Sequence, residues 1–71
     1  MGGLPKAVVK RLMTEHGGGL RVSGPALDAA AEAAEAYIAR LARAAQQAAE
    51  SNKRKTMMDS DIASARGQIG G

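Results

Sequence analysis

The sequence predicts an all-α protein of three helices, one short, one long and one short. Apolar residues recur three and four positions apart along three separate segments, which is the spacing of one helix face. Residues that begin or end helices, such as glycine, proline and serine, stand between these segments. Large apolar side chains are few, and so thin a core predicts that the chain folds as a dimer.

The first helix is expected to begin at Pro5 and to end at Gly17–Gly19. Proline suits a first helical position, where its missing N–H is not needed, and glycine adopts the left-handed conformation that closes a helix. Apolar residues between them keep helical spacing: Val8, Val9, Leu12 and Met13. The next residues, Leu20–Val22, are expected to form a short extended connector.

The long helix is expected to begin after Ser23, a good N-cap, and to continue to about residues 51–52. Pro25 is compatible with its first turn. At a rise of about 1.5 Å per residue this helix spans roughly 40 Å, longer than a globule of this chain alone. Its apolar positions alternate steps of four and three, as in a coiled-coil seam: Leu27, Ala31, Ala34, Ile38, Leu41, Ala45 and Ala48. We therefore expect two chains to share the long helix.

A basic turn, Lys53–Lys55, follows the long helix. Thr56–Asp59 then has the form of a capping box, with Asp59 in place of the usual glutamate, so the third helix is expected to start there. Its apolar residues keep helical spacing: Met58, Ile62, Ala65 and Ile69. Gly67 and the glycines at 70 and 71 indicate a frayed end.

Length and composition fit one domain, residues 1–71, with a core from about residue 4 to residue 69. Hydrophobic residues make up 45% of the chain, but sixteen of them are alanine, which buries few carbon atoms. The chain has no Trp or Phe, and Tyr37 is its one aromatic residue. A second subunit is the expected source of the missing stability.

Charge and residue content narrow the classes of function. The net charge of +3, which a homodimer doubles, and the pI near 9.8 suit a polyanion such as nucleic acid. The absence of cysteine excludes disulfides and thiolate chemistry. The sequence has no apolar run of transmembrane length and no signal-peptide pattern, so we expect a soluble cytoplasmic protein without a membrane partner.

Catalysis and metal binding find no support in the residue pattern. A nucleophilic serine needs a positioned base, and the single histidine, His16, is far in sequence from Ser51, Ser60 and Ser64. His16 also has no cysteine or second histidine to complete a metal site, and it is better placed to complement the end of the first helix. We expect no enzyme activity, cofactor, metal or small-molecule substrate.

The order of these elements and their boundary motifs resembles the histone fold, and archaeal-type histones are the most similar group. The likeness rests on four short motifs at the expected helix boundaries: Leu4–Pro5, Arg21–Ser23, Arg54–Thr56 and Asp61–Ile62. Each motif is weak by itself, whereas their order and spacing around one long helix are more specific. The resemblance covers the chain from Leu4 to about Ile69.

The resemblance implies a head-to-tail handshake dimer, in which the long helices cross and the first connector of one chain lies beside the second turn of the other. The expected dimer core residues are Leu27, Ala34, Ile38, Leu41 and Ile62. Relatives also join their dimers through a large apolar residue and a histidine, where this chain has Ala48 and Ser51. We therefore expect higher oligomers to be weak or to need DNA.

The resemblance also implies binding of double-stranded DNA, at the paired connectors and at a central site formed by the first helices. It assigns five residues to the DNA-facing surface: Arg11, Arg21, Ser23, Lys55 and Thr56. Wrapping of this type needs cationic side chains and helix N-termini but no base-specific contacts. The same chemistry adds Lys10 and Lys53.

Arg54 differs from its neighbours in the basic turn. By resemblance it pairs with an aspartate seven residues on, and Asp61 occupies that position. A guanidinium and a carboxylate form two parallel hydrogen bonds, so a structural ion pair is favoured over a direct DNA contact. The alternative for the whole turn is a solvated loop, since runs of charge are common on surfaces.

The sequence favours a homodimer that binds duplex DNA with little sequence preference, bends or wraps it, and compacts the chromosome in the nucleoid. Two alternatives stay open. One is a histone-fold subunit of a heteromeric protein assembly, with weak or no DNA binding. The other is a general helical dimerisation module whose boundary motifs match by chance.

Overall fold

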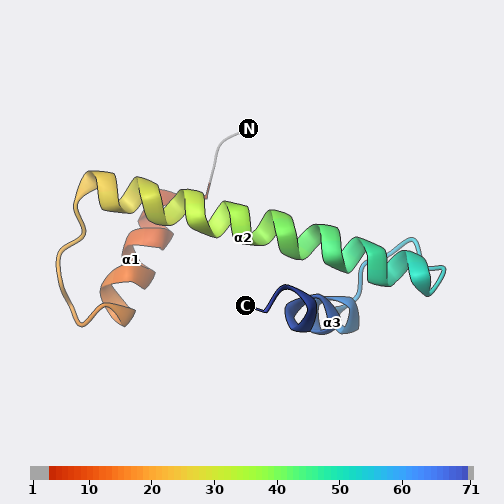
Figure 1. The fold of residues 1–71 in the computed structure, drawn as a ribbon. Coiled ribbons are helices and arrows are strands. Elements are labelled where there is room, and N and C mark those ends of the chain that lie inside the picture. Colours follow the sequence, from red (N-terminus) through yellow and green to blue (C-terminus); the bar gives the residue numbers. More distant parts are fainter. Residues whose placement is uncertain (1–3, 71) are drawn as a thin grey trace. The chain divides into compact units, whose positions relative to one another are not determined.

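The computed structural model describes residues 4–70. This part of the chain contains three helices, α1 (Lys6–His16), α2 (Gly24–Ser51) and α3 (Asp59–Ile69), and no strand (Figure 1). The predicted all-α class and the order short, long, short are confirmed. None of the three helices is long and apolar enough to cross a membrane. Residues 1–3 and 71 of the predicted domain, with the glycine expected to fray at 71, lie outside the described range.

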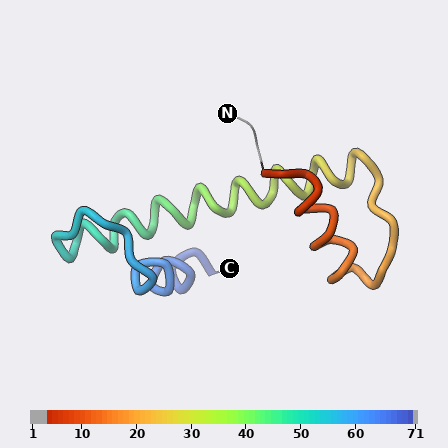
Figure 2. Tube along the Cα trace, turned by 180° about the vertical axis from the view of Figure 1, so that it is seen from behind, coloured from red at the N-terminus to blue at the C-terminus, as the bar shows by residue number. Residues whose placement is uncertain are grey.

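The chain forms two compact units, the first ending at Ala36 and the second beginning at Tyr37. The first unit holds α1 and the first part of α2, joined by the connector of residues 17–23, and the second holds the rest of α2 and α3 (Figure 2). Helix α2 belongs to both units, so each unit consists of one short helix packed on its own part of the long one.

Helix α1 begins one residue later than the sequence predicts. Pro5 precedes the helix with a ψ of 120°, and its carbonyl accepts the N–H groups of Val8 and Val9 at 3.1 and 3.2 Å. Proline thus caps the helix from outside, because its extended ψ does not continue into the first turn. At the other end the glycine run closes α1 as predicted: Gly19 donates its N–H to the Thr14 carbonyl at 3.0 Å, after Gly18 at φ 72°.

Helix α2 begins where its capping residue predicts. The Ser23 hydroxyl accepts the N–H of Ala26 at 3.2 Å, and the Ser23 carbonyl accepts that of Leu27 at 2.9 Å. Pro25 lies in the first turn, and the helix runs unbroken for 28 residues to Ser51. The predicted start, length and end of the long helix are confirmed.

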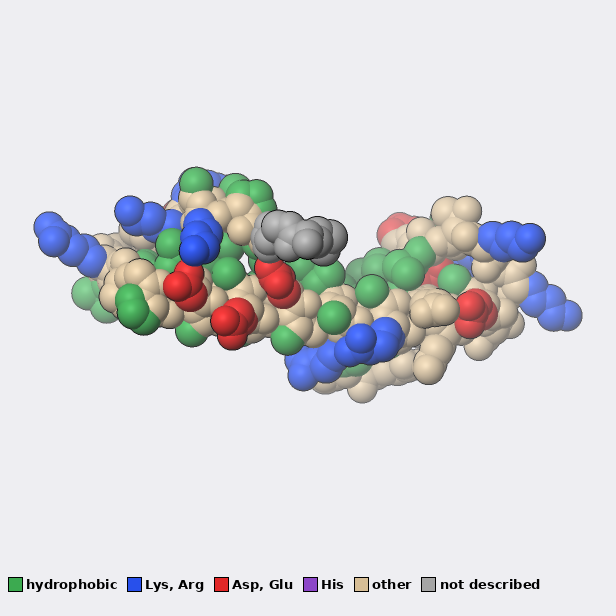
Figure 3. All heavy atoms as spheres, turned by 90° about the horizontal axis from the view of Figure 1, so that it is seen from above, with side chains coloured by type: hydrophobic (Ala, Val, Ile, Leu, Met, Phe, Trp, Pro, Cys, Tyr) green, Lys and Arg blue, Asp and Glu red, His purple; other side chains and the backbone are tan. Residues whose placement is uncertain are grey.

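The first unit has a narrow core. Val9 and Ala31 are buried, whereas Val8, Leu12 and Met13 are each more than 40% exposed. Green apolar side chains on the surface of Figure 3 show part of this incomplete burial. Polar contacts add to the packing at the edge, where Lys6 pairs with Asp28 at 2.9 Å and the Leu4 N–H donates to Glu35 Oε2 at 3.0 Å.

Helix α3 begins two residues later than the predicted capping box. Met58 is the residue before the helix, and its N–H donates to Asp61 Oδ2 at 2.8 Å. The predicted box from Thr56 to Asp59 is therefore wrong, since Asp61 and not Asp59 reaches back to the helix start. Asp59 is instead the first helical residue, and its carboxylate accepts the Ser60 N–H at 3.0 Å. Gly67 does not interrupt the helix, which continues to Ile69.

The core of the second unit is made largely of alanine. Ala44, Ala45 and Ala65 are buried, and larger residues pack against them: Leu41, Ile62 and Ile69. Alanine allows α2 and α3 to approach closely but removes little apolar area from water. Ile38 lies in the same unit and is 50% exposed. One chain therefore leaves large apolar side chains uncovered in both units.

Candidate nucleic-acid interface

The basic turn begins at a closed helix end. Lys53 donates its N–H to the Glu50 carbonyl at 2.9 Å, and Arg54 donates to the Ala49 carbonyl at 3.0 Å. These two bonds form a Schellman motif, which requires one residue in the left-handed region. That residue is Lys53, with a φ of 59°. The Asn52 amide satisfies a further carbonyl of the last turn of α2.

An ion pair fixes the rest of the turn. The Arg54 guanidinium donates to Asp61 Oδ1, and the other carboxylate oxygen accepts the Met58 N–H at 2.8 Å. The Asp61 side chain is only 3% exposed. The hydrogen bond from Arg54 and then the one from Met58 hold the pKa of Asp61 below its ordinary value. Arg54 and Asp61 are thus joined by one hydrogen bond and not by the two parallel bonds that the sequence predicts, because the second carboxylate oxygen accepts the Met58 N–H. The pair neutralises the carboxylate where it is buried.

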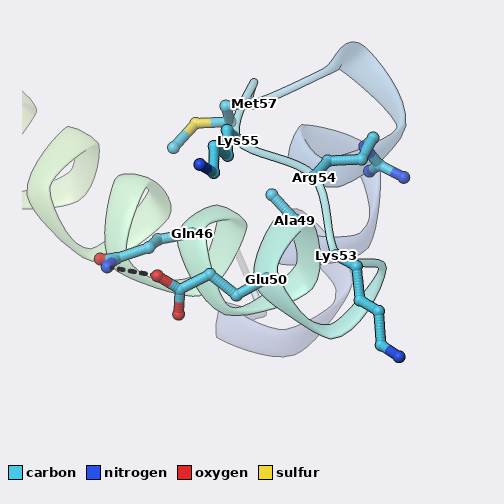
Figure 4. A pocket seen from close by; sticks show the side chains of 7 residues that line it. All are labelled: Gln46, Ala49, Glu50, Lys53, Arg54, Lys55 and Met57. Carbon is cyan, nitrogen blue, oxygen red and sulfur yellow. Dashed lines mark hydrogen bonds between the residues drawn. The ribbon is translucent and has the colours of Figure 1, made fainter.

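The two lysines of the turn are directed differently. They border an open hollow of about 570 Å³, whose lining residues are Gln46, Ala49, Glu50, Lys53, Arg54, Lys55 and Met57 (Figure 4). The Lys53 side chain extends outward, away from Lys55 and Met57. Within residues 4–70 neither lysine has an ion-pair partner, and the Glu50 carboxylate accepts a hydrogen bond from Gln46 at 3.1 Å. The turn thus presents two unpaired ammonium groups, with the exposed Thr56 next in the chain.

A second cationic hollow lies in the first unit. Its volume is about 390 Å³, and its lining residues are Lys10, Thr14, Gly19, Leu20, Arg21 and Val22. The structure thereby brings together Lys10 from α1 and Arg21 from the connector. Leu20 is 75% exposed at the same place. Ser23 lies next to the hollow in sequence but uses its hydroxyl to cap α2.

Other cations of α1 are engaged with carboxylates. Arg11 pairs with Glu15 at 3.3 Å, one turn along the helix. Lys6 pairs with Asp28, and this hydrogen bond raises the pKa of Lys6. The predicted DNA-binding residues therefore divide into two groups of unpaired cations, one in each unit, and the paired Arg11.

Two features of the site were missed by reasoning from sequence. The left-handed conformation of Lys53 has no sequence signal, because that signal is a glycine or asparagine at the position. The second is the carboxylate of Glu50, which lies at the edge of the basic hollow. Its place four residues before Arg54 and three before Lys53 was the available indication.

The three helices, with a cationic hollow at each connector, define a histone-fold domain. The family model described as the core histone domain matches residues 6–67, and the chain belongs to the histone family. No curated protein and no solved structure gives a significant match. Histone-fold proteins dimerise, bind DNA and are associated with chromosomes, and the family is in general non-enzymatic.

Proposed function

We propose that this chain is a DNA-binding histone that binds double-stranded DNA with little sequence preference, bends or wraps it, and compacts the chromosome. The observation that carries the proposal is the pair of cationic hollows, Lys10 with Arg21 and Lys53 with Lys55, each beside a connector. Exposed ammonium and guanidinium groups neutralise phosphates and release counterions, which gives affinity without reading bases. Arg11, Ser23 and Thr56 complete the proposed contact surface.

The active form in this proposal is a homodimer. Several large apolar residues are at least two-fifths exposed in one chain, among them Leu12, Met13 and Ile38, and a second copy would cover them. Its core would comprise Leu27, Ala34, Ile38, Leu41 and Ile62. A handshake arrangement would bring Arg21 of one chain beside the basic turn of the other, so each DNA site would need both chains.

Three finer points belong to the same proposal. The protein acts in the cytoplasm on the nucleoid, as an archaeal-type histone, and residues 1–71 form one domain. Dimers associate weakly, or only when DNA aligns them, because Ala48 and Ser51 offer little apolar area near the end of α2. Stable tetramers at micromolar concentration without DNA, measured by light scattering with cross-linking, would contradict this last point.

The salt dependence of DNA affinity tests the function. For a duplex of mixed sequence, log K should fall linearly with log salt, by about 0.9 per phosphate neutralised. Replacing Lys53 and Lys55 together by alanine should reduce this slope by about 1.8 per chain and weaken all sequences alike. Arg43→Ala removes one exposed charge of α2 outside both hollows and serves as the control for a change of net charge alone, scaled to one charge. Fluorescence anisotropy measures each slope, and a wild-type affinity independent of salt would refute DNA binding of this kind.

The same exposed apolar surface also fits a different histone-fold chain. In that second candidate function the protein is a subunit of a heteromeric assembly, with weak or no DNA binding. Light scattering and circular dichroism of the purified chain separate the two, because an obligate heterodimer subunit is unfolded or aggregated alone. A folded dimer excludes it.

A further inference from the structure

Each helix of this protein is followed by a residue in the left-handed region, but only one of these residues carries a side chain. Gly18 follows α1 with φ 72°, and Gly70 follows α3 with φ 70°. Lys53 occupies the equivalent position after α2 with φ 59°, and it is the single non-glycine residue with positive φ among residues 4–70. The chain thus uses glycine at two of three equivalent positions and lysine at the third.

Lysine at this position costs stability that glycine would not. In the left-handed region a Cβ atom lies too close to the following carbonyl oxygen, a clash that glycine lacks. The two hydrogen bonds that close α2 are made by the backbone N–H groups of Lys53 and Arg54. Glycine would make the same bonds, so the helix end gives no structural reason for a side chain.

Relative to glycine, the Lys53 side chain offers two structural gains: it lowers the entropy of the unfolded chain, and it is attracted by the C-terminal end of the α2 dipole. The attraction to the dipole is small for an exposed group and is screened by salt. Neither the steric strain nor the entropy of the unfolded chain depends on salt. Measurements at high salt therefore remove the dipole attraction, and a higher Tm with glycine then shows that the strain exceeds the gain in entropy.

The geometry of the turn indicates that the Lys53 side chain serves to place a positive charge. Around the turn, the Lys53 side chain extends outward (Figure 4), Arg54 is paired with Asp61, and Lys55 borders the basic hollow. The left-handed residue reverses the chain immediately after α2, so the Lys53 ammonium stands at the end of the helix without an ion-pair partner in the described chain. A residue in ordinary helical conformation would continue α2 instead.

We propose that Lys53 is a strained DNA-phosphate contact: the chain accepts a less stable end of α2 in order to place an ammonium group at the start of the basic turn. This inference rests on the proposed DNA binding and adds a trade between stability and affinity at one residue. It predicts that glycine at position 53 makes the protein more stable and a weaker DNA binder.

The test compares Lys53→Gly with Lys55→Gly. Both variants remove one charge from the same turn, but Lys55 has no positive φ, so only the first relieves strain. At high salt and fixed protein concentration, Lys53→Gly should raise Tm by about 4–8 °C, whereas Lys55→Gly should leave it unchanged or lower it. Each should reduce the slope of log K against log salt by about 1.8 per dimer, because a dimer loses two phosphate contacts.

Two further variants test the strain separately from the charge. Lys53→Arg retains charge and strain and should keep both Tm and affinity. Gly18→Lys introduces the same strain after α1, where a Cβ meets nothing within 4 Å, and should lower Tm by a similar amount.

Each outcome bears on one step of the inference. If the Tm of Lys53→Gly is equal to or below that of the wild type, position 53 is not strained and the proposal is wrong. A stabilised Lys53→Gly protein with unchanged DNA binding overturns the trade but leaves the proposed function intact. A wild type that binds no DNA at low salt overturns both.

Discussion

The two connectors of this protein reach a cationic surface by different physical means. The first, residues 17–23, obtains its turn from glycine, with Gly18 and Gly19 at φ 72° and 78°. The second, residues 52–58, contains no glycine and is shaped by an ion pair between the half-buried Arg54 and the buried Asp61. The conformational freedom of a glycine acts only on its own turn, so its loss should cost little stability. The Arg54–Asp61 ion pair instead joins the second connector to α3. Damage to the second connector should therefore unfold more of the protein.

The largest effect is expected from Asp61→Asn. This change leaves Arg54 without its counter-charge at a site where the aspartate side chain is 3% exposed. We expect Tm to fall by about 10 °C, because Arg54, whose side chain is 35% exposed, loses a charge-assisted hydrogen bond worth about 1.5–3 kcal/mol. Asp59→Asn is the matched control, an exposed carboxylate in the same helix turn that makes only the local bond to Ser60. Thermal denaturation that gives equal losses for the two variants would show that the ion pair has no special weight.

The pH dependence of stability provides a second measurement on the same pair. The pKa of Asp61 lies below its ordinary value of 3.8, so its contribution is complete above that pH and is lost as the pH falls through the lower, folded-state pKa. Acid unfolding followed by circular dichroism should therefore be shallower in Asp61→Asn than in the wild type below about pH 4. Identical acid limbs would contradict the assignment.

An intermediate effect is expected from Gly18→Ala in the first connector. The added Cβ meets nothing within 4 Å, so its cost is only that of a left-handed conformation, about 1 kcal/mol. Gly24→Ala is the control, since its Cβ also meets nothing and its φ is not positive. Chemical denaturation should show a loss for Gly18→Ala and none for Gly24→Ala. A loss of 3 kcal/mol or more at Gly18, as large as the loss expected from breaking the charge-assisted Arg54–Asp61 hydrogen bond, would remove the proposed contrast between the connectors.

Local signals predicted the fold well, and contacts between segments explain the errors. Ser23 and the glycine run act on their own helix ends, so the start of α2 and the end of α1 followed from sequence. The start of α3 did not, because the residue that caps it, Asp61, is also held by Arg54, seven residues earlier in the chain. The capping-box pattern of Thr56–Asp59 takes no account of Arg54.

The candidate site was only partly predictable for the same reason. Sequence identifies cations, but it does not tell which of them are neutralised. Lys10 and Arg21 border one hollow without an ion-pair partner in the described residues, whereas Lys6 pairs with Asp28 across two helices. The Lys6 pair spans 22 positions in sequence, beyond any local pattern. The left-handed conformation of Lys53 could not be predicted either, because the residue that indicates such a conformation is glycine.

The smallest effect is expected at Arg11, which pairs with Glu15 on the exposed surface of α1. Such a pair stabilises a helix by only about 0.3–0.5 kcal/mol, so DNA phosphate can replace Glu15 at little cost. Glu15→Gln should therefore raise DNA affinity by no more than about twofold beyond the effect of the added net charge. Glu32→Gln changes the net charge equally on α2 and provides that reference. If anisotropy titrations show the two variants to bind equally, Arg11 either does not contact DNA or is not restrained by Glu15. A gain well above twofold would mean that the Glu15 carboxylate keeps DNA phosphate away from Arg11 directly.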